Sequence, residues 1–549
     1  MDFKKELEDL FDGEVRTDAQ AREIASEDTS IFKVYPECVV YPMHTKDVCT
    51  LVRFADAHAD ELSLTARAAG TDMSGGPLTS SMVVSFTEHF TNIIEVNEAY
   101  AVVQPGVFYR DFEKETLKKG VLLPCYTASK DLNTVGGMVA NNSAGEKSLT
   151  YGKTERYVRA LKVVLSDGNE YSFAKLTLKE LEAKKAQNDF EGQLYQKIEK
   201  LILENKTCID SEKPTVSKNS AGYGIWNVWN EEDETFDLTQ LFVGSQGTLG
   251  LITEITFDLV KPKQHARMLV MFLRRRHISM LGQMINTVLS KKPESFESYD
   301  DKTFGIMLRI FPKLFKRLGG NPFTLFRDFA PEIKMILTGG IPKLVLMAEF
   351  VGDSDEEAIV AAKHAEAAVL SKYNVATHVT RSQKEGEKFW LIRRESFKLL
   401  RENVHGKNTA PFIDDISVHP EKLPEFLPKL YAILNEYKLV YTVAGHVGDG
   451  NFHIIPLMDF YSPDFKHIIR ELSERVYTLV GEYGGSITGE HNDGLIRTPY
   501  LDHMFSKQML GVFADIKKIF DPKNIFNPHK KVNGDLELML NSIKRDVKD

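Results

Sequence analysis

The chain has 549 residues, more than one compact core usually holds, so we expect at least two domains. Its formal net charge of −9 argues against broad nucleic-acid binding, and its four scattered cysteines, none in a CxxC pair, argue against an iron–sulfur cluster or zinc ribbon within the chain. These cysteines, the charged N-terminus and the lack of an apolar run of about 18 residues predict a cytoplasmic protein without a secretory signal or membrane span.

The first half of the chain predicts an α+β domain that follows a polar helical segment at residues 1–30. From Phe32 to Leu259, short apolar or β-branched runs alternate with glycine-rich loops and helical stretches. A charged helical insertion interrupts this pattern at residues 173–213. The expected strands are residues 38–42, 81–86, 99–106, 160–168 and 251–260, and the clearest helix is residues 46–60.

A second α+β region begins near Lys261. Its expected strands are residues 267–273, 343–352 and 439–445, and its expected helices are residues 355–370 and 421–437. After Tyr500 the chain is helical until it reaches two prolines, Pro522 and Pro528. We therefore expect domains at residues 31–260 and 261–505, and a C-terminal helical segment, residues 506–549, that returns to the first domain.

Three stretches of the first domain, residues 65–76, 129–154 and 244–250, are rich in glycine and small polar residues. Small residues let backbone N–H groups approach a ligand, and successive N–H groups form anion-binding nests. One such stretch is usually an ordinary surface loop, but three in one domain favour a cofactor that carries phosphate. The Rossmann fingerprint is absent, and YGKT at 151–154 does not complete a Walker A loop because Lys147 occupies the required first glycine.

Two of these segments, VGGMVANNSAGEKSLTYGKT and VGSQGTLGLITE, resemble the FAD-binding domain of the vanillyl-alcohol-oxidase and p-cresol-methylhydroxylase (PCMH) fold. The resemblance implies FAD as cofactor. The histidine that tethers FAD covalently in some members corresponds to Thr71, which implies non-covalent FAD. The implied cofactor-binding residues are Ala68, Ala69, Gly70, Thr71, Asp72, Met73, Ser74 and Gly75 around the pyrophosphate, Ser129, Gly136, Gly137, Asn141, Ala144 and Gly145 along the flavin, Ile252 beside the adenine, and Asn527 in the C-terminal segment.

The stretch GHVGDGNFH predicts a β-hairpin that carries two histidines. With Asp449-Gly450 as a two-residue turn, His446 lies opposite His453, and opposed side chains share a face with Cβ atoms about 4.5–5.5 Å apart. Such a pair suits two ligands of one divalent metal ion, although a cross-strand aromatic pair is an equal alternative. A later stretch, GEHNDG, adds Glu490 as a hard oxygen ligand, and two histidines with one carboxylate favour a catalytic metal site.

The residue after this carboxylate, His491, points to the opposite side of an extended chain, so we expect it to act as a base rather than a ligand. Together with DPKNIFNPHK, the two stretches resemble the C-terminal domain of the FAD-linked oxidases, which occurs in D-lactate, glycolate and D-2-hydroxyglutarate dehydrogenases. With the FAD domain, the resemblance covers roughly residues 30–531. It implies that His446, His453 and Glu490 hold zinc, manganese or iron, and that His491 is the general base.

The family also holds the substrate carboxylate with an arginine that follows a tryptophan. FWLIRRES supplies Arg393 three residues after Trp390, and the alternative is a solvated basic helix face. A lysine that the 2-hydroxyglutarate enzymes carry corresponds to Ile413 in this chain. This difference favours a monocarboxylate such as lactate, unless another basic residue takes the place of that lysine.

The implied reaction is oxidation of a 2-hydroxy acid to a 2-oxo acid. Arg393 would fix the carboxylate, the metal would lower the pKa of the hydroxyl, His491 would accept its proton, and the C2 hydride would pass to flavin N5. The alternatives are a non-redox transferase like the alkylglycerone-phosphate synthases and a flavoprotein subunit of a larger redox complex.

Electrons would leave the chain to a quinone, an electron-transfer protein or a separate iron–sulfur subunit, because the cysteines do not predict a cluster. Residues 311–327 interleave basic and aromatic side chains. They could contact the inner face of a membrane, but packing within the second domain, which would cap the active site, is favoured. The sequence does not determine the oligomeric state, and a homodimer is one of the possible assemblies.

Overall fold

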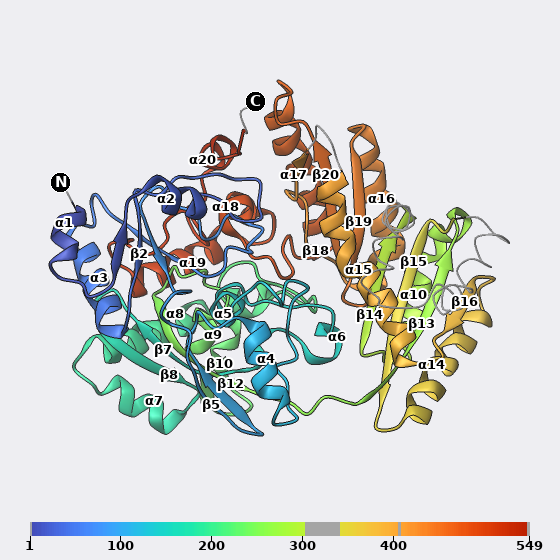
Figure 1. Cartoon of the computed structure of the whole chain (residues 1–549), viewed down its shortest axis with the longest axis horizontal. Helices are drawn as coiled ribbons and strands as arrows, with labels where there is room; N and C mark the ends of the chain where they lie inside the picture. The colour runs from blue at the N-terminus through green and yellow to red at the C-terminus, as the bar shows by residue number, and fades with distance from the viewer. Residues whose placement is uncertain (1–2, 302–340, 404–407, 546–549) are drawn as a thin grey trace. The chain divides into compact units, whose positions relative to one another are not determined.

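The computed structural model describes residues 3–301, 341–403 and 408–545 (Figure 1). The chain divides into two compact units. Both units combine helices with β-sheets, which confirms the predicted α+β fold class. Unit 1 comprises Met1–Gly145, Gly152–Pro262 and Ser486–Asp549, and unit 2 comprises Glu146–Tyr151 and Lys263–Gly485.

The first sheet of unit 1 has the strand order β1-β2-β4-β3. Strands β2, β4 and β3 are parallel, and β1 pairs antiparallel with β2. Helix α3 (Thr45–Ala57) follows β2 and buries Val48, Leu51, Val52 and Ala55, which recur at helical spacing, in the core of this sheet. The strand bounds are β1 (Glu14–Arg16), β2 (Cys38–Tyr41), β3 (Leu64–Arg67) and β4 (Met82–Ser85).

A second, antiparallel sheet of unit 1 has the order β5-β6-β12-β7-β8, and a small third sheet has the order β10-β11-β9. In β12 every second residue is buried, which is the pattern expected for a strand with one face in the core. The strand bounds are β5 (Ile93–Val96), β6 (Tyr100–Val103), β7 (Val158–Val164), β8 (Glu170–Ala174), β9 (Leu176–Thr177), β10 (Trp229–Asn230), β11 (Thr235–Phe236) and β12 (Leu251–Asp258).

The helices of unit 1 include the predicted insertion, which forms α7 and the long helix α8. The helix bounds are α1 (Phe3–Glu8), α2 (Ala19–Ala25), α4 (Tyr109–Leu117), α5 (Val135–Asn141), η1 (Thr154–Arg156), α7 (Leu178–Lys185), α8 (Phe190–Glu212), η2 (Ile225–Asn227), α9 (Thr239–Phe242), α18 (Gly494–Arg497), η6 (Thr498–His503), α19 (Lys507–Phe520) and α20 (Leu536–Asn541). Helix α8 packs against α19, so the insertion supports the C-terminal part of the same unit.

Unit 2 is built on one antiparallel sheet with the order β16-β13-β15-β14-β19-β20-β17, and β18 also pairs with β20. The strand bounds are β13 (His265–Leu273), β14 (Ser295–Asp300), β15 (Leu344–Gly352), β16 (Ala376–Val379), β17 (Asn408–Thr409), β18 (Ile416–Ser417), β19 (Val440–His446) and β20 (Asn451–Met458). The helix bounds are α6 (Ser148–Tyr151), η3 (Arg275–Met280), α10 (Leu281–Leu289), α14 (Asp355–Leu370), α15 (Gln383–Asn403), η4 (Pro420–Lys422), α16 (Leu423–Glu436), η5 (Val447–Asp449) and α17 (Phe465–Glu482).

The boundaries of the units differ from the expected boundary between residues 505 and 506. The chain returns to unit 1 at Ser486, because the loop that follows is hydrogen-bonded there: Ser486 Oγ donates to Asn219 Oδ1 at 2.8 Å. Conversely, the short segment Glu146–Tyr151 belongs to unit 2, where Tyr151 donates to Glu294 Oε1 at 3.1 Å. Sequence composition does not reveal either exchange, since each depends on long-range polar contacts.

The segment predicted to contact a membrane or to pack in the second domain, residues 311–327, lies outside the described residues. Among the helices that the structure does describe, none combines the length and the hydropathy of a membrane span.

Candidate functional site

The three glycine-rich loops of unit 1 are joined by one polar network centred on Gln246. Its side-chain amide donates to Ser74 Oγ at 3.0 Å and to Asn141 Oδ1 at 3.3 Å, and its backbone N–H donates to Ala140 O at 2.9 Å. The Gln246 side-chain oxygen accepts from the backbone N–H of Gly494 at 2.8 Å. The fold therefore assembles the three loops that the sequence singled out.

Two aspartate side chains hold the shape of the first loop. Asp72 accepts from the backbone N–H groups of Ser74 and Gly76, and Asp28 accepts from that of Gly75. In the described chain, no acceptor meets the backbone N–H groups of residues 70–73, which are half-buried. Of the residues predicted to wrap the pyrophosphate, Ser74 and Gly75 thus have their N–H groups occupied, and residues 70–73 fit the phosphate-bearing part of FAD.

The hydrogen bonds of Arg67 and the backbone conformation of Gly70 fix the start of this loop. The guanidinium of Arg67 donates to the backbone oxygens of Ile24, Ala25 and Glu27. Gly70 adopts a φ of 68°, and a Cβ atom there would clash with the same guanidinium. A side chain at Gly70 would therefore strain the backbone and displace Arg67.

The residues predicted to line the flavin lie on α5 and the turns around it. The N–H of Gly136 donates to Pro105 O at 2.9 Å, and Cβ atoms at Gly136 and Gly145 would clash with backbone atoms of Pro105 and Tyr126. These two glycines are thus already required by packing within the chain. A Cβ atom at Gly137 would lie 3.2 Å from Ala68 Cβ, so this glycine adjoins the first loop.

The other predicted cofactor residues have different environments. Ser129 is half-buried in a turn, Ala144 is buried, and Ile252 is half-buried on β12 next to a bulge in its pairing with β7. The side chain of Asn527 is fully buried, donates to Gly76 O and Gln246 O, and accepts from Thr65. Asn527 therefore ties the loops together through its side chain, whose amide oxygen and nitrogen both have partners within the chain.

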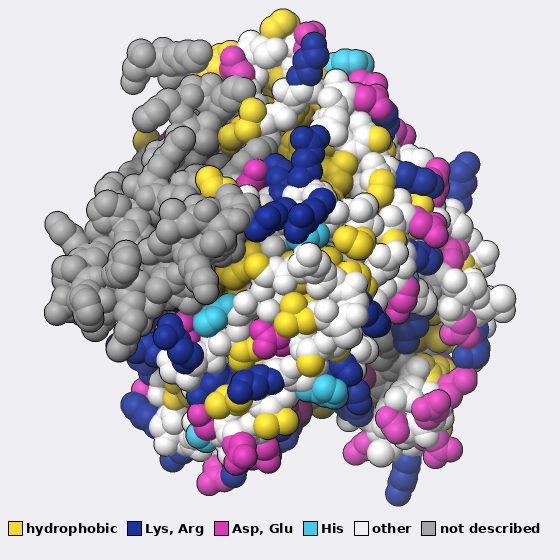
Figure 2. Space-filling model, turned by 90° about the vertical axis from the view of Figure 1, so that its right-hand side faces the viewer, with side chains coloured by type: hydrophobic (Ala, Val, Ile, Leu, Met, Phe, Trp, Pro, Cys, Tyr) yellow, Lys and Arg dark blue, Asp and Glu magenta, His cyan; other side chains and the backbone are white. Residues whose placement is uncertain are grey.

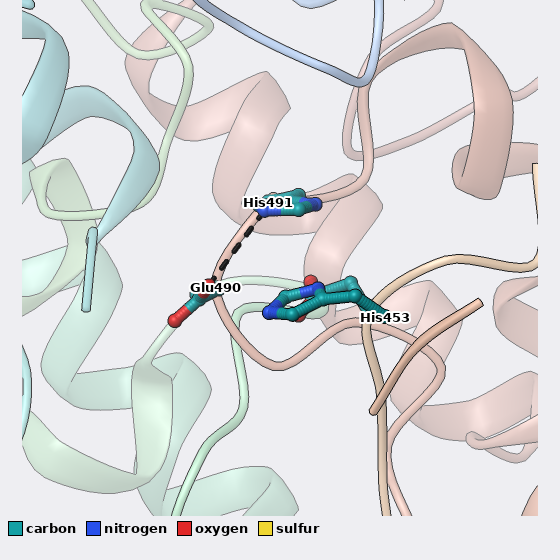
Figure 3. Close-up of side chains that lie close together, drawn as sticks. His453, Glu490 and His491 are labelled. Atoms are coloured by element: carbon teal, nitrogen blue, oxygen red, sulfur yellow. Dashed lines mark ion pairs between the residues drawn. The ribbon is translucent and has the colours of Figure 1, made fainter. Parts of the chain in front are cut away.

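Glu490 and His491 lie on the loop after Ser486 in unit 1, and Figure 3 labels both side chains. His491 Nε2 lies 3.7 Å from Glu490 Oε1, the ion pair dashed in Figure 3. Lys218 Nζ lies 3.0 Å from Glu490 Oε2, and Lys218 is fully buried. Lys218 could not be found from the sequence, because 272 residues separate it from Glu490.

The hairpin of unit 2 forms, but the predicted register is wrong. Residues 447–449 form the short helix η5, so His446 pairs with Asn451 and His453 pairs with Ala444. A shift of two residues keeps side chains on the same face of a sheet, and the two imidazole rings lie 5.3 Å apart, edge to face. The two histidines are thus diagonal neighbours rather than directly opposed residues.

Each of these histidines faces a buried carboxylate through its Nδ1 atom. His446 Nδ1 lies 2.5 Å from Glu297 Oε1, and His453 Nδ1 lies 3.1 Å from Asp414 Oδ1. A histidine that ligates a metal usually donates its other ring N–H to a carboxylate or carbonyl in this way. Both histidines thus have at Nδ1 the carboxylate contact that is common among metal-ligating histidines.

Arg393 is 5% exposed, and this burial excludes the alternative of a solvated helix face. Its Nε atom lies 3.3 Å from Glu297 Oε2, so the carboxylate that contacts His446 also contacts the predicted substrate arginine. Arg394, the neighbouring residue, pairs instead with Glu146. Glu297 and Asp414 could not be found from the sequence, because nothing in their local sequence shows that they face histidines on another strand.

A further buried carboxyl group of unit 2, that of Glu349, has a raised pKa. Burial raises the pKa of Glu349 to about 7, although Lys147 and the Trp390 indole, which donates at 2.9 Å, both oppose this shift. The folded protein therefore holds a proton on Glu349 between pH 4.5 and 7 that the unfolded chain releases, so stability falls as pH rises through this range.

Replacement of Glu349 by glutamine is expected to remove this loss of stability. The amide keeps an acceptor for Trp390 but carries no charge to bury, so the variant should be more stable than the natural protein by about 2 kcal/mol at pH 8 and by little at pH 4.5. Denaturant unfolding of both proteins at the two pH values measures the difference. A parallel pH dependence of the two proteins would contradict the assignment.

Comparison with known sequences supports the two-part organisation. The sequence model of a FAD binding domain matches residues 36–173, and that of the C-terminal domain of FAD linked oxidases matches residues 262–531. The chain is 27% identical to a D-2-hydroxyglutarate dehydrogenase of Escherichia coli over 543 residues, covering 96% of this chain and 51% of that protein. The chain thus spans about half the length of that relative.

Shorter relatives match over most of their own length. The chain is 27% identical to the glycolate oxidase subunit GlcD of Bacillus subtilis, covering 91% of this chain and 90% of that protein. A D-lactate dehydrogenase of Anaerostipes hadrus is 26% identical with the same coverage.

Solved structures resemble the fold as a whole. An alkyldihydroxyacetonephosphate synthase superposes with a TM-score of 0.64 at 16% identity, covering 96% of this chain and 84% of that one. A p-cresol methylhydroxylase with substrate bound gives 0.65 at 14% identity, covering 95% and 94%. At these identities the likeness shows the fold alone.

Proposed function

Because sequence models of a FAD binding domain and of the C-terminal domain of FAD linked oxidases match the chain, we propose that it oxidises a 2-hydroxy acid to the 2-oxo acid. The observation that carries the proposal is the side-chain cluster of unit 2. There, two histidines are oriented by buried carboxylates, and one of these carboxylates, Glu297, also contacts a buried arginine. This donor set suits a divalent cation beside a carboxylate group, which is the chemistry that a 2-hydroxy acid requires.

Bound FAD would supply the two-electron acceptor, and the loop at residues 70–73 with the network around Gln246 supports its non-covalent binding in unit 1. Thr71 stands where a covalent histidine tether would be, so acid precipitation should release the flavin into solution. We keep Ala68 to Met73 as the pyrophosphate contacts and Ile252 as the adenine contact of this proposal.

In the proposed reaction Arg393 binds the substrate carboxylate through its guanidinium. His446 and His453 would hold a zinc, manganese or iron ion, with Glu490 as the third ligand that the family resemblance implies, and such an ion would lower the pKa of a hydroxyl group bound to it. His491 accepts the hydroxyl proton. Because its Nε2 faces Glu490, the tautomer with hydrogen on Nε2 leaves Nδ1 as the proton acceptor.

The preferred substrate in this proposal is a monocarboxylate of the D-lactate type. Ile413 is fully buried and brings no charge to the position where the 2-hydroxyglutarate enzymes carry a lysine. A second carboxylate on the substrate would therefore need a cation from another residue. The relatives include enzymes named for D-lactate and for D-2-hydroxyglutarate, so both acids belong in the test.

The electron acceptor is proposed to be a quinone, an electron-transfer protein or a separate iron–sulfur subunit. The four described cysteines are free, and none of them pairs with another. Figure 2 shows acidic and basic side chains interspersed over the drawn face, with one group of Lys and Arg side chains near the centre of the view. A peripheral membrane contact, a homodimer and a cytoplasmic location remain parts of the proposal.

The central test is an absorption spectrum of the purified protein, followed by anaerobic addition of D-lactate. We expect an oxidised flavin spectrum that bleaches, with D-2-hydroxyglutarate and glycolate as parallel additions. A flavin that none of these acids bleaches would favour the alternative of a non-redox transferase on the same fold. Failure to bind FAD after reconstitution would contradict the assignment of the glycine-rich loops.

A further inference from the structure

Glu297 is a buried carboxylate with two functional partners. It lies on β14, all of whose residues are buried, and is 1% exposed. Its Oε1 atom lies 2.5 Å from His446 Nδ1 at the end of β19, and its Oε2 atom lies 3.3 Å from Arg393 Nε on α15. One side chain thus contacts two residues that the proposed function uses for different tasks.

We propose that Glu297 is a positioning residue that sets metal binding by His446 and substrate-carboxylate binding by Arg393 at the same time. This inference rests on the proposed function and adds to it a physical link between the two binding tasks.

The contact with His446 selects its tautomer. A hydrogen on Nδ1 donates to the carboxylate, and the lone pair of Nε2 is then available to a cation. Asp414 makes the equivalent contact with His453. The two carboxylates therefore form a matched pair with respect to the histidines, and Glu297 adds to this shared role its contact with Arg393.

The contact with Arg393 fixes the plane of the guanidinium. Glu297 meets it through Nε rather than through the two terminal Nη groups, which form the fork that a carboxylate ligand prefers. The negative charge also offsets the cost of burying the arginine. A carboxylate has two acceptor oxygens, one for each partner, whereas an amide has one.

The test compares Glu297→Gln with Asp414→Asn, two variants of similar shape that each remove one charge beside a histidine. Metal affinity is measured for the FAD-loaded full chain by competition for Zn²⁺ against a chromogenic chelator. We expect both variants to bind Zn²⁺ about 10–100-fold more weakly than the natural protein. At saturating metal, the KM for D-lactate should rise about tenfold more in Glu297→Gln than in Asp414→Asn, because the former also disturbs the contact that orients Arg393.

The possible results distinguish a failure of the positioning role of Glu297 from a failure of the proposed function. Unchanged Zn²⁺ affinity in Glu297→Gln, or equal KM values in the two variants, would overturn the positioning role while the proposed function stands. If the natural protein binds no metal, the metal part of the proposed function fails and this inference fails with it. If Glu297→Gln does not fold, Glu297→Asp replaces it, because aspartate keeps the buried charge but is too short to reach both partners. A Zn²⁺ affinity and a KM for D-lactate equal to those of the natural protein would then overturn the proposal.

Discussion

His491→Ala is expected to slow flavin reduction by D-lactate about 10²–10⁴-fold while FAD remains bound. Removal of the imidazole removes the group that accepts the hydroxyl proton, and a positioned general base contributes a factor of this size. His491 lies beside Glu490 with an Nε2–Oε1 distance of 3.7 Å, so its orientation depends on that carboxylate. Anaerobic stopped-flow absorption at the flavin band measures the rate directly.

A matched control for this variant is His503→Ala. His503 is also half-buried in unit 1, where its ring packs against Tyr500, and it has no proposed part in the reaction. The control should reduce its flavin at close to the natural rate. Natural reduction rates in His491→Ala would refute the assignment of the base, and loss of FAD from that variant would show that His491 supports the cofactor site instead.

Lys218→Met is expected to cost about 3–5 kcal/mol of stability. The ammonium of Lys218 is fully buried and lies 3.0 Å from Glu490 Oε2, and Glu490 itself is 8% exposed. Removing one partner of a buried ion pair leaves the other charge without this compensation in a poorly solvated place. Denaturant unfolding followed by tryptophan fluorescence gives the free energy difference.

Two further variants serve as controls for the stability measurement on Lys218→Met. Lys218→Met combined with Glu490→Gln should recover much of the lost stability, since it also removes the buried charge that has lost its lysine partner. Lys206→Met breaks an exposed pair with Glu231 and should change stability by less than about 1 kcal/mol. Equal effects of Lys218→Met and Lys206→Met would show that the buried pair contributes no more than a surface pair.

Local backbone requirements make the glycine-rich loops recognisable in the amino-acid sequence. Gly70 and Gly75 adopt φ values of 68° and 78°, which a residue with a side chain rarely adopts, so these positions favour glycine. The presence of a hairpin around Gly-Asp-Gly and the alternation of strands with helices follow from similarly short-range rules. The α+β class, the three loops and the proximity of the two hairpin histidines were therefore accessible from the chain alone.

The register of that hairpin was not accessible in the same way. Gly450 adopts a left-handed φ of 63°, as a tight turn would need, yet residues 447–449 coil into η5 and lengthen the connection. The length of the turn depends on neighbouring strands: the Gly450 carbonyl accepts from the backbone N–H of Val418 near β18. A pattern of residues within the hairpin does not contain that information.

The two carboxylates and the lysine that contact the candidate site residues could be identified only in the folded structure. Glu297 is 149 residues from His446 in sequence, Asp414 is 39 from His453, and Lys218 is 272 from Glu490. A charged residue is usually exposed, and its sequence neighbourhood does not reveal that it will be buried against a distant partner. These pairings are strong and specific because they are buried. Burial is decided by tertiary packing, whereas turns and periodicities are decided by the local sequence.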